Sequence, residues 1–220
     1  MSRRPVRHVL LDADGVVQQS TTLGGEIDTL TSLLGEGTTD WLTRTFPPDG
    51  PVLRGGANVV PLLAEALLAN GSDADAQRVY DDLWLTMQVS SESLAVARAL
   101  RASGVGVHLA TNQDRGRAAY MKTELGYDEV FDSSFYSSDV GWAKPSAEFF
   151  THVVDQLGAD PDEVLFVDDS QANVDGARAA GLHAERWEIA EGIESLRALL
   201  STYGLTTTNP LADDAGHVRE

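Results

Sequence analysis

The chain has 220 residues, of which 42% are hydrophobic, and this content suffices for one large domain with a buried core and a smaller insertion. Its 34 acidic residues outnumber 16 basic ones, and the formal net charge of −18 argues against nucleic acids and anionic membranes as partners. The chain has no cysteine and no apolar run of the ~18–20 residues that a transmembrane helix needs, which excludes disulfides, thiol chemistry and a membrane span. Because only a short apolar run follows the basic N-terminal residues, we expect no signal peptide and a cytoplasmic location.

The first predicted element is a buried strand at residues 8–12, an apolar run that stops at Asp12-Ala13-Asp14-Gly15. Residues 17–88 then show helical patterns, notably at 59–69 and 75–87, but no convincing buried strand. We therefore expect a mainly helical insertion over residues 17–88, placed after the first strand of the core.

From residue 91 onward, strand and helix patterns alternate. Apolar runs at 105–110 and 164–167 predict two more buried parallel strands, and residues 182–187 are a further candidate. Helical patterns cover four segments, each followed by a glycine: 91–103, 115–125, 147–157 and 173–180. The alternation predicts an α/β fold with a doubly wound parallel sheet, formed by residues 1–16 and 89–205, with a flexible tail at 206–220.

Polar side chains follow three of these strands, and the carboxyl ends of parallel strands meet at one edge of a sheet. The residues gathered there are Asp12, Asp14, Thr111, Asn112, Asp168 and Asp169, with Lys144 in a loop between the second and third of these strands. Two carboxylates ~4 Å apart repel by roughly 4 kcal/mol at an effective dielectric near 20, and a hard divalent cation removes that repulsion. Ligation by oxygen alone favours Mg²⁺.

In chain order, Asp12-Ala13-Asp14-Gly15-Val16, Thr111-Asn112, Lys144-Pro145 and Asp168-Asp169 resemble the four-motif signature of the haloacid dehalogenase-like (HAD) hydrolase superfamily. The resemblance spans residues 8–187 and implies a Rossmann-like core, and the helical insertion resembles the four-helix cap of that family. Residues 138–145 and 167–173 are most similar to the branch that contains sugar-phosphate phosphatases and the phosphatase domain of soluble epoxide hydrolase.

The resemblance implies a role for each motif residue. Asp12 would be the nucleophile that becomes a phosphoaspartate, and Asp14 the general acid that later activates water. Thr111, the main-chain amide of Asn112 and Lys144 would hold the phosphoryl oxygens. The metal ligands would be Asp12, Asp169 and the main-chain carbonyl of Asp14, with Asp168 either a further ligand or a partner of one, and Asn173 would support the metal waters or the substrate.

These roles imply a Mg²⁺-dependent phosphatase whose partner is a small phosphorylated metabolite. A phosphomutase of the same superfamily, which returns the phosphoryl group to an intermediate, is the alternative. The dehalogenase branch lacks an acid two residues after the nucleophile, so Asp14 favours phosphoryl transfer. From a different class, a catalytically silent or receiver-like phosphate-binding protein has similar acidic residues, but receivers are shorter and have no helical insertion.

The cap region also contains candidates outside the motifs. Arg54, within Arg54-Gly55-Gly56, is a candidate for binding substrate anions, although a plain turn is the favoured explanation of this segment. Trp142, two residues before Lys144, is the tryptophan with the best functional case. We expect the connections near residues 17–24 and 86–92 to act as hinges that close the cap over a bound substrate.

Overall fold

The structure, a computed structural model, describes residues 4–20 and 25–207, and its main sheet has five parallel strands. The strand order is β5-β4-β1-β6-β7, so the first strand lies at the centre of the sheet. The strands are β1 (His8–Leu11), β4 (Gly106–Thr111), β5 (Ser133–Tyr136), β6 (Val164–Asp168) and β7 (His183–Arg186). Because β1 pairs in parallel with both β4 and β6, the residues that follow these three strands lie side by side at one edge.

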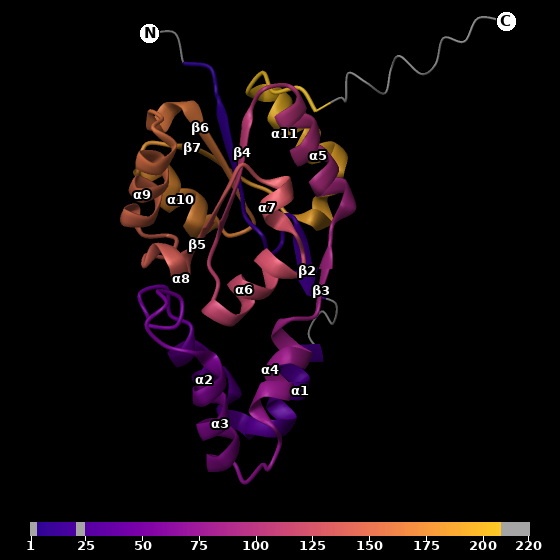
Figure 1. The fold of residues 1–220 in the computed structure, drawn as a ribbon, viewed down its shortest axis with the longest axis vertical. Coiled ribbons are helices and arrows are strands. Elements are labelled where there is room, and N and C mark those ends of the chain that lie inside the picture. The colour runs from indigo at the N-terminus through magenta and orange to yellow at the C-terminus, as the bar shows by residue number, and fades with distance from the viewer. Residues whose placement is uncertain (1–3, 21–24, 208–220) are drawn as a thin grey trace, which may run out of the picture.

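Helices cover both faces of this sheet (Figure 1). Side chains alternate along a strand, so Val9 and Leu11 pack into one apolar cluster and Leu10 into another. The first cluster includes residues of α5 (Ser91–Ala102), α6 (Arg115–Thr123), α7 (Tyr127–Val130) and α11 (Ile193–Thr202). The second includes residues of α9 (Ala147–Leu157) and α10 (Gln171–Ala179), and the short helix α8 (Ser137–Val140) follows β5.

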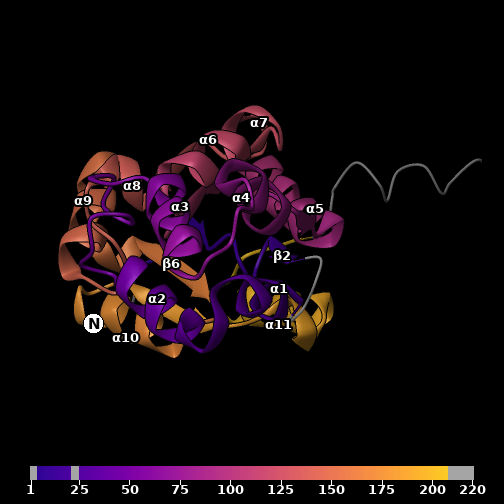
Figure 2. The ribbon, with the colours of Figure 1, turned by 90° about the horizontal axis from the view of Figure 1, so that it is seen from below.

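Four helices between residues 25 and 84 form a separate group around their own apolar cluster. They are α1 (Gly25–Leu34), α2 (Thr38–Thr45), α3 (Val59–Ala69) and α4 (Ala76–Trp84), with a 3₁₀ turn at Gly35–Gly37 between the first two. The core has two further 3₁₀ turns, at Pro161–Glu163 and Ile189–Glu191. The group lies at the end of the molecule opposite the N-terminus, where the strands have their carboxyl ends, and Figure 2 shows these helices in front of the core. The helical group therefore faces the edge at which the sequence places the functional residues.

The sequence-based prediction of the core elements is confirmed, with the doubly wound parallel sheet and the helices near their expected bounds. The sequence patterns did not predict two short strands at the two ends of this region, neither of which is a continuous buried apolar run. β2 (Gln18–Ser20) and β3 (Met87–Val89) pair antiparallel where the chain enters and leaves the helical group. Strand β5 was also not predicted. The domain bounds themselves stay a prediction, and from residue 208 on the predicted tail lies outside the described residues.

Among the described residues, no helix is both long enough and apolar enough to cross a membrane.

Candidate active site

The sheet brings three of the predicted motifs together. Asp12 follows β1 directly, and its main-chain N–H donates to the carbonyl of Val167 at 3.0 Å, which continues the pairing of β1 with β6. Thr111 is the last residue of β4, and Asp168 is the last residue of β6. All three side chains are buried, and they come from adjacent strands at the same edge.

Lys144 lies at the centre of this group with only 1% of its side chain exposed. Its Nζ is 2.8 Å from Asp12 Oδ1 and 2.6 Å from Asp168 Oδ2, and it donates to the carbonyl of Ala110 at 2.9 Å. Burial alone would lower the pKa of Lys144, but the two carboxylates hold it above its usual value. The lysine therefore stays charged and links the ends of β1, β4 and β6.

Asp168 is fully buried, and both of its carboxylate oxygens are hydrogen-bonded. Oδ1 accepts from the main-chain N–H of Ser170 at 2.8 Å and from Asn173 Nδ2 at 3.0 Å. Oδ2 accepts from Lys144, and Asn173 Nδ2 is 3.1 Å away from it as well. The donors thus fix the orientation of this carboxylate without a metal ion. Asn173, expected to support metal waters or the substrate, contacts Asp168 in this structure.

A cluster of three carboxylates fits a divalent cation. One ligand atom each from Asp12, Asp168 and Asp169 lies within 4.8 Å of the other two. Burial raises the pKa of Asp12 well above its usual value, an effect that the Lys144 ammonium opposes and the Asp168 charge reinforces. Burial and Asp168 likewise raise the pKa of Asp169. Crowded oxygen ligands of this kind are the donor set that Mg²⁺ prefers, and bound Mg²⁺ would relieve their repulsion.

Gly15 lets the chain after Asp14 pass close to this cluster. It has a φ of +77°, and a Cβ at this position would lie 2.5 Å from Asp169 Oδ2. The left-handed backbone and the close approach both require glycine. The chain therefore turns sharply at Gly15, and the close approach to Asp169 gives a packing reason for glycine that the sequence did not show.

Asp14 points to different partners from those of Asp12. Its Oδ1 and Oδ2 accept from the two terminal nitrogens of Arg117, each at 2.8 Å. Gln18 Nε2 donates to Oδ1 at 2.9 Å, and Gln113 Nε2 donates to Oδ2 at 2.8 Å. Burial on its own would raise the pKa of the Asp14 carboxyl, but Arg117 and the two amides hold that pKa below its usual value.

Sequence reasoning missed all three partners of Asp14. Arg117 belongs to none of the predicted motifs. It reaches Asp14 from the first turn of α6, and Asp114 caps this helix by accepting from the main-chain N–H groups of Gly116 and Arg117. Gln18 belongs to the unpredicted strand β2. A usable signal was present only for Gln113, which lies two residues after Thr111 and donates to its hydroxyl at 3.0 Å.

Asn112 contributes a contact that the prediction did not include. Its side chain donates from Nδ2 to the main-chain carbonyl of Lys144 and accepts at Oδ1 from the main-chain N–H of Lys144, both at 2.8 Å. These two hydrogen bonds fix the lysine loop next to β4. Thr111, the last residue of β4, is buried, with 1% of its surface exposed.

The helical group contacts the core near Lys144. Arg54 Nε donates to the carbonyl of Gly141 at 2.8 Å, and its guanidinium carbon is 4.1 Å from the centre of the Trp142 ring. Gly55, with a φ of +74°, passes so close that a Cβ would lie 2.1 Å from the carbonyl of Ser138. Arg54, a candidate for binding substrate anions, is therefore engaged with the loop before Lys144 in this structure.

A family model described as haloacid dehalogenase-like hydrolase matches residues 6–181, and this match covers most of the chain. The chain belongs to this family. The four motifs, the parallel sheet and the acidic cluster of this hydrolase agree with the membership that the sequence pattern implied.

Relatives and solved structures show the same likeness. A sesquiterpene phosphatase of Aspergillus oryzae is 35% identical over 89 residues, which are 40% of this chain and 45% of that protein, so the chain spans less than half of that relative. A phosphorylated carbohydrates phosphatase of Thermotoga maritima is 25% identical over 160 residues, covering 69% of this chain and 72% of that one. A HAD family enzyme of Bacteroides thetaiotaomicron in complex with magnesium and inorganic phosphate shares the fold, with a TM-score of 0.73 and 18% identity over 87% of this chain and 98% of that chain.

Proposed function

We propose that this hydrolase is a Mg²⁺-dependent phosphatase that cleaves a small phosphorylated metabolite through a phosphorylated Asp12. The observation that carries the proposal is the contrast between two carboxylates only two residues apart. Asp12 lies among carboxylates and a buried ammonium, whereas Asp14 is held by a guanidinium and two amides. Two acidic groups in different surroundings suit two different roles, nucleophile and proton carrier.

The residues that would hold Mg²⁺ are Asp12, Asp169 and the main-chain carbonyl of Asp14. Asp168 is the less suitable direct ligand, because Lys144, Ser170 and Asn173 already donate to its oxygens. Asp169, in contrast, makes no ion pair with any other described residue. When bound, Mg²⁺ supplies the positive charge that lets an anionic phosphate approach Asp12.

In the first step, Asp12 attacks the phosphorus atom and the bond to the leaving oxygen breaks. Asp12 Oδ1 accepts from the N–H of Ala13 at 2.7 Å and from Lys144, which leaves Oδ2 for the attack. The ammonium of Lys144, the hydroxyl of Thr111 and the main-chain amide of Asn112 hold the phosphoryl oxygens as their charge redistributes. The leaving oxygen takes its proton from Asp14.

In the second step, Asp14 accepts a proton from water while the water oxygen attacks the phosphorus of the phosphorylated Asp12. Phosphate leaves, and the Asp12 carboxylate is restored. The lowered pKa that Arg117 imposes keeps Asp14 ionised, as a base needs. To act as the acid in the first step, Asp14 has to carry a proton, so its contact with Arg117 has to loosen when substrate binds.

The helices over the strand ends fit the predicted cap, and we propose that the β2–β3 pair is its hinge. The chain enters and leaves the helical group through these two strands, which pair with each other at three positions. Closure over a substrate would exclude bulk water from Asp12 and would admit small molecules more readily than phosphoproteins. The names of the relatives, one for a sesquiterpene and one for phosphorylated carbohydrates, point to small phosphate esters of varied chemistry.

The test is phosphate release by Asp12→Asn against the wild type, in Mg²⁺. We expect a loss of at least about 10³-fold in kcat, because the amide keeps the shape of Asp12 but is a poor nucleophile. Asp128→Asn, which removes one exposed carboxylate of the core, is the matched control and should retain full activity. Hydrolysis by Asp12→Asn at the wild-type rate would overturn the assignment of the nucleophile.

A further inference from the structure

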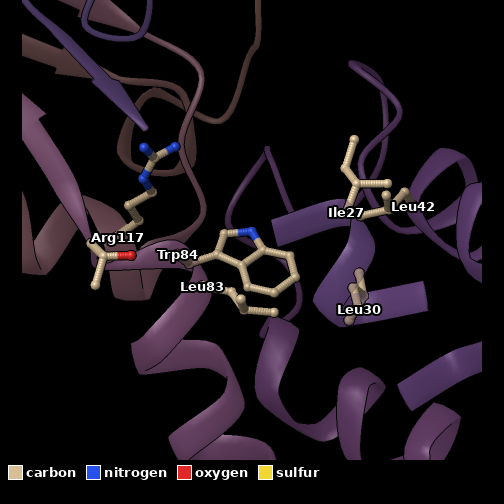
Figure 3. Close-up of a pocket in the computed structure, with 7 residues that line it drawn as sticks. Ile27, Leu30, Leu42, Leu83, Trp84 and Arg117 are labelled. Carbon is tan, nitrogen blue, oxygen red and sulfur yellow. The ribbon is translucent and has the colours of Figure 1, made fainter. Parts of the chain in front are cut away.

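Near Asp14, two neighbouring spaces lie between the helical group and the core, the first lined mainly by apolar side chains and the second by apolar and polar ones. The first is a cavity of about 190 Å³, lined by five apolar residues, Ile27, Leu30, Leu42, Leu83 and Trp84, together with Thr86 and Arg117. In Figure 3, Trp84 lies between Arg117 on one side and Ile27, Leu30 and Leu42 on the other. The second, of about 160 Å³, shares Leu42, Trp84 and Arg117 with the first. The shared side chains make the two spaces neighbours.

These spaces begin one side chain away from the proposed acid. Arg117 lines both of them, and Gln113 lines the second, while both residues donate to the carboxylate of Asp14 at 2.8 Å. In the proposed reaction, Asp14 faces the leaving oxygen and Lys144 faces the phosphoryl group. The carbon skeleton of the leaving group therefore extends from Asp14 toward these spaces.

The charges around the spaces disfavour an anionic leaving group. Among the described residues that line them, Arg117 is the cation, and its two terminal nitrogens are already paired with Asp14. Its Nε is buried and has no hydrogen-bond partner among the described residues, so it remains as a single neutralised donor rather than a site for an anion. The carboxylate of Asp114 also lines the second space and accepts from the hydroxyl of Tyr80 at 2.7 Å. An anion buried without its own partner is strongly disfavoured. The isoleucine, leucine and tryptophan side chains offer no hydrogen bond, so a leaving group with several hydroxyls would find few partners beyond the polar groups beside Arg117.

We propose, on the basis of the phosphatase function above, that the substrate is a phosphate monoester of an apolar alcohol carrying one ring or a short branched chain. The size of the proposed alcohol follows from the volume of the first cavity, because an apolar space of ~150 Å³ accommodates benzene. A space of about 190 Å³ accommodates a group slightly larger than one ring. Leu42 and Trp84 contact the leaving group from the cap, and specificity follows from the apolar area that it buries there.

The experiment compares phosphate monoesters of primary alcohols that differ in polarity: 3-methylbutyl and cyclohexylmethyl phosphate against glycerol 3-phosphate and 2-phosphoglycolate. The polar pair carry the better leaving groups, because their neighbouring oxygens withdraw electrons, so intrinsic reactivity works against the expected order. We expect kcat/KM for the two apolar esters to exceed that for the polar pair at least tenfold. Higher kcat/KM for either polar ester would overturn the proposal.

Two variants place a polar group in the space without touching Asp14. Leu42→Gln and Leu83→Gln should each raise KM for 3-methylbutyl phosphate about tenfold and change kcat less than threefold. The kinetic constants for glycerol 3-phosphate should stay unchanged. The reason is that a mismatch between one substrate group and its apolar pocket changes kcat/KM between two substrates by ~10–200-fold. Thr43→Gln, exposed on the same helix as Leu42, is the matched control and should change neither KM. An equal loss on both substrates, with a lowered melting temperature, would show a structural role and contradict the proposal.

p-Nitrophenyl phosphate separates this inference from the function on which it rests. If the wild type releases phosphate from none of the esters, including this activated one, the phosphatase function itself fails. If it hydrolyses p-nitrophenyl phosphate and prefers glycerol 3-phosphate to the apolar esters, the phosphatase function stands and the apolar substrate class is wrong.

Discussion

Replacing Lys144 by methionine tests the central electrostatic contact of the site. Methionine keeps most of the length and the apolar stem of lysine but removes the ammonium that lies 2.8 Å from Asp12 and 2.6 Å from Asp168. The side chains of these acids are only 9% and 0% exposed, so water cannot take the place of the lost cation. The Ala110 carbonyl loses its donor as well.

Removing one partner of a buried ion pair destabilises a protein by about 3–5 kcal/mol, because the remaining charge stays buried without compensation. In a chain of this size each kcal/mol lowers the melting temperature by about 2–4 °C, so Lys144→Met should melt about 6–20 °C below the wild type. Lys144→Arg keeps the charge but forces a larger group into a full site, which should cost about 1–3 kcal/mol and most of the turnover.

Thermal unfolding followed by circular dichroism measures these shifts, and phosphate release measures turnover. Lys122→Met is the matched control, because it removes the only other lysine of the chain. Lys122 pairs with Asp139 at the surface, with side chains 36% and 51% exposed, and such a pair is worth about 0–1 kcal/mol. If Lys144→Met melted within about 2 °C of this control, or Lys144→Arg kept normal turnover, the argument for a buried compact cation would be refuted.

Three further predictions concern the metal, the acid and a histidine pair. Chelation should abolish phosphate release, Mg²⁺ should restore it, and Ca²⁺ should restore little. Mg²⁺ at 100 times its Kd should also raise the melting temperature by about 5–11 °C, because binding at that excess adds about 2.7 kcal/mol to the free energy of unfolding. An unchanged melting temperature would count against the acidic cluster as a metal site. Asp14→Asn should accumulate phosphorylated enzyme from an aryl phosphate, whose leaving group needs little protonation, whereas equal loss of both steps with no trapped intermediate would contradict a separate acid–base role. Burial and the nearby His8 lower the pKa of His108 to about 4 from 6.5, so folded His108 stays neutral while the unfolded chain takes up a proton as the pH falls below 6.5. The wild type should therefore lose about 2 kcal/mol of stability between pH ~6.5 and ~4 that His108→Leu does not lose, and equal pH slopes in urea unfolding would refute this account.

The strands that sequence patterns predicted share one property, a continuous apolar run that is buried on both sides. Residues 164–167 are an example, since every position of β6 is buried. β5 begins with two serines at the edge of the sheet, where only its last two residues are buried, and it therefore gave no apolar run. β2 and β3 have three residues each and include Gln18 and Gln88, so neither polarity nor length distinguishes them from a loop.

Some contacts of the predicted site could likewise be predicted from the sequence, and others could not. Asp12, Thr111 and Asp168 lie together because each ends or directly follows a strand of one parallel sheet, and the strand pattern of the sequence predicts that. Lys144 reaches Asp12 and Asp168 from a loop. The hydrogen bonds of Asn112 to the main chain of Lys144 could not be predicted, because they depend on how the loop at 141–145 folds back over β4. Arg117 was missed for the same reason, since its contact with Asp14 joins residues 103 positions apart.

The choice of cation at each of these places follows from the geometry of its acceptors. The chain uses arginine for all but two of its 16 basic residues, so the presence of lysine rather than arginine at a position calls for an explanation. At Lys144, three acceptors from three different residues, Asp12, Asp168 and Ala110, surround a single point, and a compact ammonium with three N–H donors matches them. At Arg117, the two oxygens of one carboxylate lie side by side, and a planar guanidinium binds both. The two cations therefore give the two carboxylates of the first motif different surroundings: the lysine holds Asp12 within the acidic cluster, and the arginine holds Asp14 toward the space proposed for the leaving group.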